Sequence, residues 1–229
     1  MEILTPFDFV ERYSEGKRVA VVGNAPSTLE YPIGQAIDDF DYIIRFNECT
    51  TVGFEEHIGS RTSILIANPY AETRSRRILD GQRAEMVLVI ASQTRRGDRK
   101  IFSDWLEDHP VLFTYCPDLV TVPDSAHKAG LTTGTYGLQL IQRVLKPSEM
   151  LVTGFTMFAD EDHSHYWKAG IPGGIHAHDF QGETVIFANM LNTFKCVTYV
   201  TPDVRLLLQK SGVSAAGHIR DLAMPEQHR

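Results

Sequence analysis

The sequence predicts a doubly wound α/β fold, with a mostly parallel, Rossmann-like sheet and helices on both faces. Short β-branched or apolar runs recur along the chain, and helical patterns alternate with them. This alternation is typical of βαβ units, in which a helix connects two parallel strands. The 229 residues, 43% of them hydrophobic, suffice for a sizeable core. We therefore expect one compact domain over 1–229.

The individual elements follow from the same two patterns. Short apolar runs predict seven buried strands at 19–22, 42–46, 63–67, 86–90, 111–114, 150–153 and 197–200. Amphipathic stretches between them predict helices at 7–13, 33–40, 71–80, 100–107, 136–145, 178–194 and 204–210. In such sheets ligands bind beyond the carboxyl ends of the strands. Residues just after each apolar run are therefore the candidates for a site.

Charge and cysteine content exclude several classes of protein. A net charge of −7 argues against a nucleic-acid binder that neutralises many phosphates. The three cysteines, Cys49, Cys116 and Cys196, form no C-x-x-C pair, so a disulfide scaffold or a cysteine metal site is not expected. The first residues carry neither a signal-peptide pattern nor an apolar run of membrane-spanning length. We expect a cytoplasmic protein with reduced thiols and no integral membrane segment.

Asparagines follow two of the predicted strands. Gly23 and Asn24 come directly after strand 19–22, and Asn47 comes directly after strand 42–46. A glycine permits a sharp turn there, and amides can both donate and accept hydrogen bonds, which suits an uncharged nucleoside. The G-x-G-x-x-G and P-loop patterns are missing, which disfavours NAD, FAD and P-loop nucleotides. Ordinary turn chemistry is the alternative for these residues.

A hydroxyl- and glycine-rich turn leads into the helix expected over 136–145. It contains Thr132, Thr133 and Gly134. Such a turn directs free backbone N–H groups and the positive end of a helix at an anion. An ordinary threonine N-cap is the alternative interpretation.

Titratable side chains concentrate between residues 160 and 183. Four of the nine histidines, His163, His165, His176 and His178, fall in this stretch, and Glu183 ends it. Histidine is the side chain best matched to proton transfer near neutral pH, so the cluster indicates acid–base chemistry. A divalent-metal site and a solvated loop with incidental histidines are the alternatives, and no H-E-x-x-H pattern supports a metal.

Four segments stand in a particular order along the chain. They are VAVVGNAPS followed by IGQAIDDFDYIIRFNECTTVGFEEHIGSRT, then GLTTGTYGLQLIQRVL followed by MLVTGF, then His165-Tyr166-Trp167, and finally the H-x4-E spacing from His178 to Glu183. In order and spacing they resemble the long, short, third and very short motifs of the sialyltransferases, glycosyltransferase family 29. The resemblance covers about half the chain, over 19–62 and 130–190. It implies a GT-A-like variant of the fold, with nucleotide-binding segments at 19–69 and 130–190.

The chain departs from the family pattern at several places. Val19 stands where animal members have the first cysteine of a pair, and no cysteine follows in RVLKPSEMLVTGF. Lys168 occupies a place that is often acidic or an amide in the third motif. The very short motif also aligns on His176, which would put Gln181 at the place of the glutamate. We prefer His178, because it keeps the following apolar positions in helical step.

The resemblance implies an activity and a role for each residue. It implies inverting transfer of a sialic acid or related 2-keto-3-deoxy acid from a CMP-activated donor to a glycan hydroxyl, with no metal and no other cofactor. By the same resemblance, Gly23, Asn24, Asn47, Thr132, Thr133, Gly134 and Tyr166 bind the donor. His178 is the base, with His176 as its alternative and Glu183 in support, and His165 meets the phosphate.

Several alternatives stay open at this level. CMP-Kdo shares the carboxylate and the deoxy carbon with CMP-sialic acid and is a second candidate donor. A catalytically silent nucleotide-binding protein of the same fold is a second class, and a metal-dependent hydrolase using the histidines is a third. The acceptor glycan, including a lipid-linked one at the inner membrane face, and the linkage are not fixed by these motifs. The oligomeric state is not fixed either.

Overall fold

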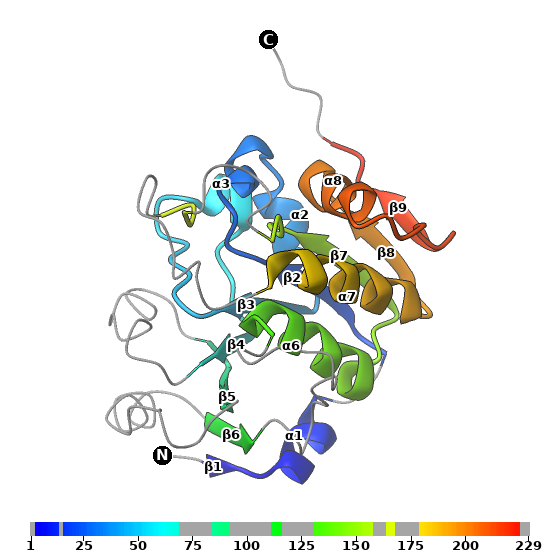
Figure 1. The fold of residues 1–229 in the computed structure, drawn as a ribbon. Helices are drawn as coiled ribbons and strands as arrows, with labels where there is room; N and C mark the ends of the chain where they lie inside the picture. Colours follow the sequence, from blue (N-terminus) through cyan, green and yellow to red (C-terminus); the bar gives the residue numbers. More distant parts are fainter. Residues whose placement is uncertain are drawn as a thin grey trace.

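A computed structural model of the chain describes residues 3–13, 16–68, 84–91, 111–115, 131–157, 164–167 and 179–224. Within these residues the strands form one sheet of nine, and all neighbouring strands are paired in parallel (Figure 1). The strands are β1 (Ile3–Leu4), β2 (Arg18–Val22), β3 (Tyr42–Phe46), β4 (Ile64–Ala67), β5 (Met86–Ala91), β6 (Val111–Tyr115), β7 (Glu149–Thr153), β8 (Val197–Val200) and β9 (Ile219–Asp221).

The strand order reverses direction at β2. Across the sheet the order is β1-β6-β5-β4-β3-β2-β7-β8-β9, so the chain runs outward from β2 to β6 on one side and from β7 to β9 on the other. In the register, Val22 lies between Arg45 of β3 and Thr153 of β7. Ligands of open parallel sheets bind at such a switch point, outside the carboxyl ends of the strands. We therefore expect a ligand to bind beyond the carboxyl ends of β2, β3 and β7, and we call this region the crevice.

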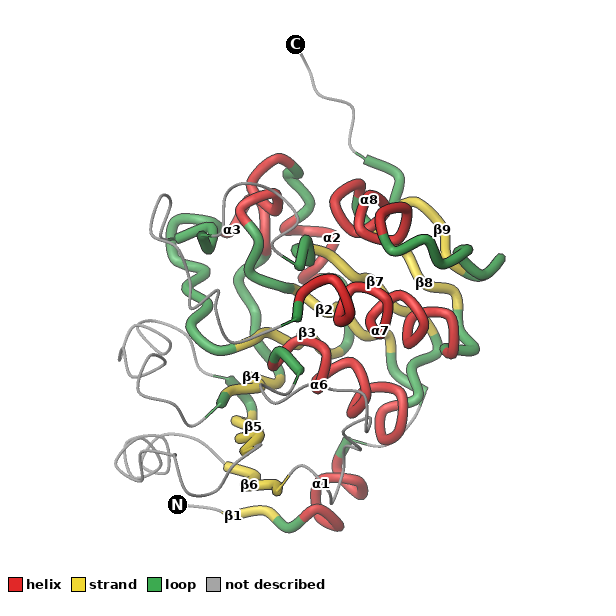
Figure 2. The backbone as a smooth tube through the Cα atoms, viewed as in Figure 1, coloured by secondary structure: helices red, strands yellow, loops and turns green. Residues whose placement is uncertain are grey.

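Helices cover both faces of the sheet (Figure 2). They are α1 (Pro6–Arg12), the 3₁₀ turn η1 (Pro26–Glu30), α2 (Gly34–Asp38), α3 (Glu55–Ile58), α6 (Thr133–Leu140), its π-helical continuation η4 (Ile141–Leu145), α7 (Phe180–Thr193) and α8 (Pro202–Lys210). Side chains of α6, α7 and α8 pack in one apolar cluster with one face of the sheet. Side chains of α2 and α3 pack in a second cluster on the opposite face.

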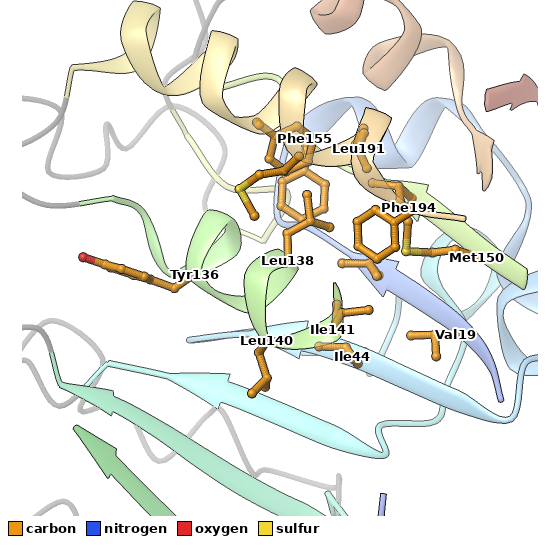
Figure 3. Packing of buried hydrophobic residues seen from close by; sticks show 14 of the residues in the cluster. Val19, Ile44, Tyr136, Leu138, Leu140, Ile141, Met150, Phe155, Leu191 and Phe194 are labelled. Carbon is orange, nitrogen blue, oxygen red and sulfur yellow. The ribbon is translucent and has the colours of Figure 1, made fainter. Parts of the chain in front are cut away.

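Alternation along β2 divides the core between the two faces. Val19 and Val21 belong to the cluster under α6 and α7, while Ala20 and Val22 belong to the cluster under α2 and α3. Figure 3 shows the first cluster, where Leu138 of α6 and Leu191 of α7 project toward the strands. Because β2 is buried on both sides, its sequence is continuously apolar from Val19 to Val22.

The seven predicted strands are all present, each within one residue of its expected ends. Two short edge strands, β1 and β9, add to the prediction, as do η1 and α3. Five of the predicted helices correspond to α1, α2, α6 with η4, α7 and α8. The helices expected at 71–80 and 100–107 lie outside the described residues. The α/β class, the parallel sheet and the helices on both faces are thus confirmed.

Nothing in the described ranges has the length and apolar character of a bilayer-spanning helix.

Candidate active site

The loops that follow β2 and β7 lie in direct backbone contact. The Gly23 N–H donates to the Thr153 carbonyl at 2.8 Å, and the Ala25 N–H donates to the Gly154 carbonyl at 3.1 Å. A side chain on Gly23 would collide with the Gly154 carbonyl. Gly154 itself has φ +76°, a conformation that favours glycine. The glycine predicted at this strand end therefore serves the close approach of two loops.

A series of hydrogen bonds links the ends of β2, β3 and β4 to the start of α6. The Asn24 Nδ2 donates to the Phe46 carbonyl at 2.8 Å. The next residue, Asn47, has φ 50° and accepts at Oδ1 from the Asn68 N–H at 3.1 Å. Asn68 in turn donates through Nδ2 to Thr133 Oγ1 at 3.3 Å. The polar residues predicted from separate strand ends thus lie in one connected row.

The side-chain oxygen of Asn24 differs from the other polar atoms in this row. The Oδ1 of Asn24 is buried and has no hydrogen-bond partner among the described residues. Both its Nδ2 and its backbone carbonyl are occupied, the latter by the Tyr166 N–H at 3.2 Å. An unsatisfied buried acceptor is costly, and a bound ligand that donates a hydrogen bond would remove that cost. Asn24 Oδ1 is therefore the clearest ligand-directed atom on the strand side of the crevice.

Glu183 of α7 holds the first turn of α6. Its Oε1 accepts from the Thr132 N–H at 2.7 Å, from the Thr132 hydroxyl and from the Thr135 hydroxyl. Glu183 is 3% exposed and Thr135 is fully buried. Thr132 is also the N-cap of α6, because its side chain accepts from the Thr135 N–H. The carboxylate therefore fixes the position of the α6 N-terminus relative to α7.

This arrangement leaves particular donors for an anion. Thr132 directs both its N–H and its hydroxyl to Glu183, whereas the N–H groups of Thr133 and Gly134 have no partner in the described part of the chain. The Thr133 hydroxyl accepts from Asn68, so its own proton stays available for donation. Free N–H groups at the positive end of a helix are suited to bind an anion such as a phosphate.

The His165-Tyr166-Trp167 segment packs against the loops after β2 and β3. The Tyr166 hydroxyl donates to the Thr50 carbonyl at 2.6 Å, and its ring contacts Phe54 edge-on. Tyr166 is 4% exposed, and burial raises the pKa of its hydroxyl. The ring of His165 stacks on Trp167 with centroids 4.8 Å apart. Tyr166 is thus a buried residue that packs beside the loop containing Asn24, and His165 is more exposed than Tyr166.

A buried guanidinium supports the same loops from the α2 and α3 face. Arg45 of β3 is 1% exposed and donates to the carbonyls of Ile58 and Arg61 at 2.6 and 3.0 Å. Burial lowers the pKa of Arg45, and burial raises the pKa of the neighbouring Cys49 thiol to about 12. Cys49 and Cys196 are free thiols. The thiol of Cys49 is therefore protonated and unreactive near neutral pH.

The structure brings most of the predicted residues to one end of the sheet. Gly23, Asn24, Asn47, Thr132, Thr133, Gly134, Tyr166 and Glu183 are joined by the contacts above, and His165 adjoins Tyr166. His176 and His178 lie outside the described residues, although His178 immediately precedes the Asp179 N-cap of α7. Sequence reasoning did not single out Asn68. The signal was available, since Asn68 directly follows a predicted strand, as Asn47 does.

No group of three or more metal-ligating side chains occurs among the residues described. The contacts instead combine a neutral amide surface at the ends of three strands with unpaired N–H donors at a helix start. A neutral surface beside an anion site is suited to a nucleoside that carries a phosphate.

The sequence of the chain is similar to known proteins of one enzyme family. The family described as glycosyltransferase family 29 (sialyltransferase) matches residues 6–116. The CMP-N-acetylneuraminate-beta-galactosamide-alpha-2,3-sialyltransferase 1 of Mus musculus is 41% identical over 73 residues, which is 32% of this chain and 20% of the mouse protein. The protein of the same name from Pan troglodytes is 26% identical over 215 residues, covering 81% of this chain and 61% of that protein.

The fold is also similar to a solved enzyme. The crystal structure of a mammalian sialyltransferase in complex with Gal-beta-1-3GalNAc-ortho-nitrophenol superposes with a TM-score of 0.58 at 19% identity, over 80% of this chain and 69% of that one. The chain spans only about a fifth of the mouse relative in their match, so the similarity is concentrated in part of that protein. Residues 6–116 of this chain thus match glycosyltransferase family 29, the sialyltransferases, and these relatives and the similar fold point to the same family.

Proposed function

We propose that the protein transfers a sialic acid, or a related 2-keto-3-deoxy acid, from a CMP-activated donor to a hydroxyl of a glycan. The observation that carries the proposal is the row of hydrogen bonds from Asn24 to Thr133, which ends at the free N–H groups of α6. This row suits a nucleoside along the strand ends and its phosphate at the helix start. Relatives that act on CMP-N-acetylneuraminate, according to their names, support the choice of donor.

The proposed reaction is a single displacement with inversion. The acceptor hydroxyl attacks the anomeric carbon of the donor, the bond from that carbon to the phosphate oxygen breaks, and CMP leaves. His178 takes the proton of the acceptor hydroxyl, with His176 as the alternative base. The N–H groups of Thr133 and Gly134, the Thr133 hydroxyl and His165 stabilise the charge that develops on the departing phosphate. A leaving group with a single phosphate can be stabilised in this way without a metal or another cofactor.

Glu183 and Tyr166 act through their neighbours in this proposal. Glu183 occupies the Thr132 donors and thereby orients Thr133 and Gly134 toward the phosphate. The Tyr166 hydroxyl is directed at Thr50 rather than at a ligand, and the Tyr166 N–H holds the Asn24 carbonyl.

The sheet order supports a Rossmann-like, GT-A-like assignment, with 1–229 as one domain. We also propose that the protein acts in the cytoplasm on an acceptor that can include a lipid-linked glycan.

A thermal-unfolding panel tests the donor class. At one hundred times its dissociation constant, CMP should stabilise the folded protein by about 2.7 kcal/mol without added metal. UDP, NAD and divalent metals should have little effect. The Asn24→Ala variant should lose most of the CMP effect, whereas Asn192→Ala should keep it, because the Asn192 amide bonds to Ser214 away from the crevice.

Three outcomes would contradict the proposal. Stabilisation by UDP or NAD without any by CMP would refute the donor class. A requirement for a divalent metal would favour the hydrolase alternative. CMP binding without transfer from either CMP-sialic acid or CMP-Kdo would identify a silent nucleotide-binding protein.

A further inference from the structure

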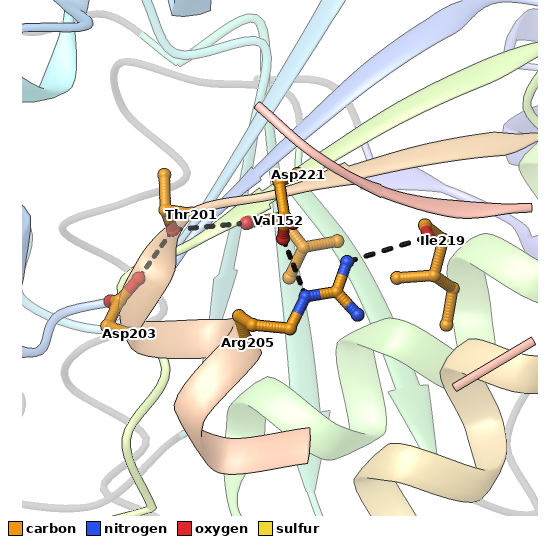
Figure 4. Close-up of polar contacts among 6 residues, drawn as sticks. All are labelled: Val152, Thr201, Asp203, Arg205, Ile219 and Asp221. Atoms are coloured by element: carbon orange, nitrogen blue, oxygen red, sulfur yellow. Dashed lines mark hydrogen bonds and ion pairs between the residues drawn. The ribbon is translucent and has the colours of Figure 1, made fainter. Parts of the chain in front are cut away.

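Asp203 collects hydrogen bonds from three separate loops. Its Oδ2 accepts from the Ser27 hydroxyl at 2.8 Å and from the Gly154 N–H at 3.0 Å. Its Oδ1 accepts from the Thr201 hydroxyl, which also lies 3.4 Å from the Val152 carbonyl (Figure 4). Ser27 follows β2, Gly154 follows β7 and Thr201 follows β8. The carboxylate therefore joins the segments that leave three neighbouring strands at the same edge of the sheet.

The carboxylate is buried and has no ionic partner within the described part of the chain. Asp203 is 7% exposed, and no Lys, Arg or His of the described ranges forms a salt bridge with it. It lies in the first turn of α8, where the helix dipole stabilises a negative charge. The neutral donors and the helix end thus satisfy the buried carboxylate, which in turn fixes the position of each donor.

Two of those donors flank the Asn24 loop. Ser27 is bonded to Asp203 directly. Gly154 is bonded to Asp203 through its N–H and to Ala25 through its carbonyl. The segment from Gly23 to Ser27 is therefore held both at its turn and at the start of η1. Asn24, with its unpartnered Oδ1, lies within the held segment.

We propose that Asp203 is a positioning residue for the nucleotide, which fixes the 23–27 loop so that the Asn24 amide meets the bound donor. The inference rests on the proposed function, since it assumes that Asn24 contacts a nucleotide. It extends that function to a residue outside the motifs that the sequence indicates and outside the 6–116 family match. Asp203 touches no reacting atom in this role.

The Asp203→Asn variant makes a sharp test, because its side chain has nearly the shape of the carboxylate. The amide carbonyl can accept from Ser27 and Gly154 as the carboxylate does, and the NH₂ can donate to the Thr201 oxygen while the Thr201 hydroxyl turns to Val152. Asp203→Asn should therefore keep CMP affinity within about threefold, whereas Asp203→Ala should weaken it about tenfold or more. Ser27→Ala, which removes one of the donors, should lie between the two.

The matched control is the exposed carboxylate Asp221, which pairs with Arg205 at 2.6 Å on the other side of α8 (Figure 4). Asp221→Ala should leave CMP affinity unchanged. The CMP dissociation constant is measured by titration calorimetry well below each melting temperature, and the donor KM and kcat are measured beside it. We expect Asp203→Ala to raise the donor KM while kcat at saturating donor changes less than about threefold.

The outcomes separate the two proposals. If wild-type protein does not bind CMP, the proposed function fails and this inference falls with it. If wild type binds CMP and Asp203→Ala melts earlier but binds CMP equally well, Asp203 is structural only and this inference alone is overturned. Equal losses in Asp203→Asn and Asp203→Ala would also overturn it, because the charge rather than the loop geometry would then matter. If Asp203→Ala does not fold, the comparison of Ser27→Ala with Asp203→Asn decides in the same way.

Discussion

Glu183 of α7 and Asp203 of α8 are two buried carboxylates that differ in the origin of their hydrogen-bond donors. Each lies near the start of a helix and accepts from hydroxyl and backbone donors. The donors to Glu183 all come from one helical turn, Thr132 and Thr135 of α6. Those to Asp203 come from three loops. Glu183 therefore orients one rigid helix end, where an anion binds, whereas Asp203 holds separate connections together, where the nucleoside binds.

This difference predicts that variants on the two sides fail in different ways. On the α6 and α7 side, changes should affect the phosphate and the chemistry. On the β2, β7 and β8 side, changes should affect binding of the whole nucleotide.

The largest effect is expected at the proposed base on the α7 side. His178→Ala should lower the transfer rate by about 10²- to 10⁴-fold while CMP affinity survives, because a general base acts only on the acceptor hydroxyl. His176→Ala, two residues away, is the matched control and should be much milder. Rates with a CMP-sugar donor and the CMP dissociation constant are measured for both variants. The reverse order would make His176 the base, and two active variants would refute a histidine base.

A smaller effect separates the two carboxylates directly. Glu183→Ala should weaken CMP about tenfold or more, because the first turn of α6 loses its anchor, but it should leave the affinity for cytidine unchanged. Asp203→Ala should instead weaken CMP and cytidine by the same factor. Cytidine binding can be followed by NMR titration at millimolar ligand.

Two controls accompany this measurement. Glu183→Gln keeps an oxygen for the Thr132 and Thr135 donors and should resemble wild type. Glu149→Gln removes a carboxylate that pairs with Arg18 at the amino-terminal ends of β7 and β2, away from the crevice. This variant should change neither the CMP affinity nor the cytidine affinity. Equal loss of cytidine and CMP in Glu183→Ala would break the proposed division.

The smallest effect concerns Cys49, a buried acid that has no hydrogen-bond donor among the described residues. Burial raises its pKa from 9.0 to about 12, so the folded state resists deprotonation at a pH where the unfolded chain already ionises. The contribution to stability is present below pH 9 and is lost as the pH rises from about 9 toward 12. Urea unfolding at pH 8 and pH 10 should show a smaller loss of stability in Cys49→Ala than in wild type. An equal loss in both would show that Cys49 ionises as readily in the folded protein.

The sequence predicted the strands well because each central strand is buried on both faces and is therefore continuously apolar, as in β2, β3 and β4. It missed β9, whose residues Ile219–Asp221 include two exposed charged side chains, because an edge strand needs no such run. It also missed α3, a single turn between Phe54 and Gly59. Short elements of this kind are determined by their tertiary neighbours rather than by a pattern of their own.

The same reason limits what the sequence could predict of the site. The strand-end rule found Asn24 and Asn47, since it uses only local order. It could not show that Glu183 occupies both donors of Thr132, because these residues are 51 positions apart. Asp203 carries no motif at all, and its partner Ser27 lies 176 positions away. Contacts between distant loops become visible only when the sheet order is known.

The contact between Gly23 and Gly154 limits how this crevice can open. Backbone hydrogen bonds of 2.8 and 3.1 Å join the two loops, and no side chain separates them. Moving β2 away from β7 would break these bonds and the five-residue pairing that precedes them. The junction between β2 and β7 is therefore a rigid part of the crevice and does not act as a hinge. Any motion that admits a donor or releases CMP has to displace other parts of the crevice, while the Gly23 and Gly154 loops stay in place.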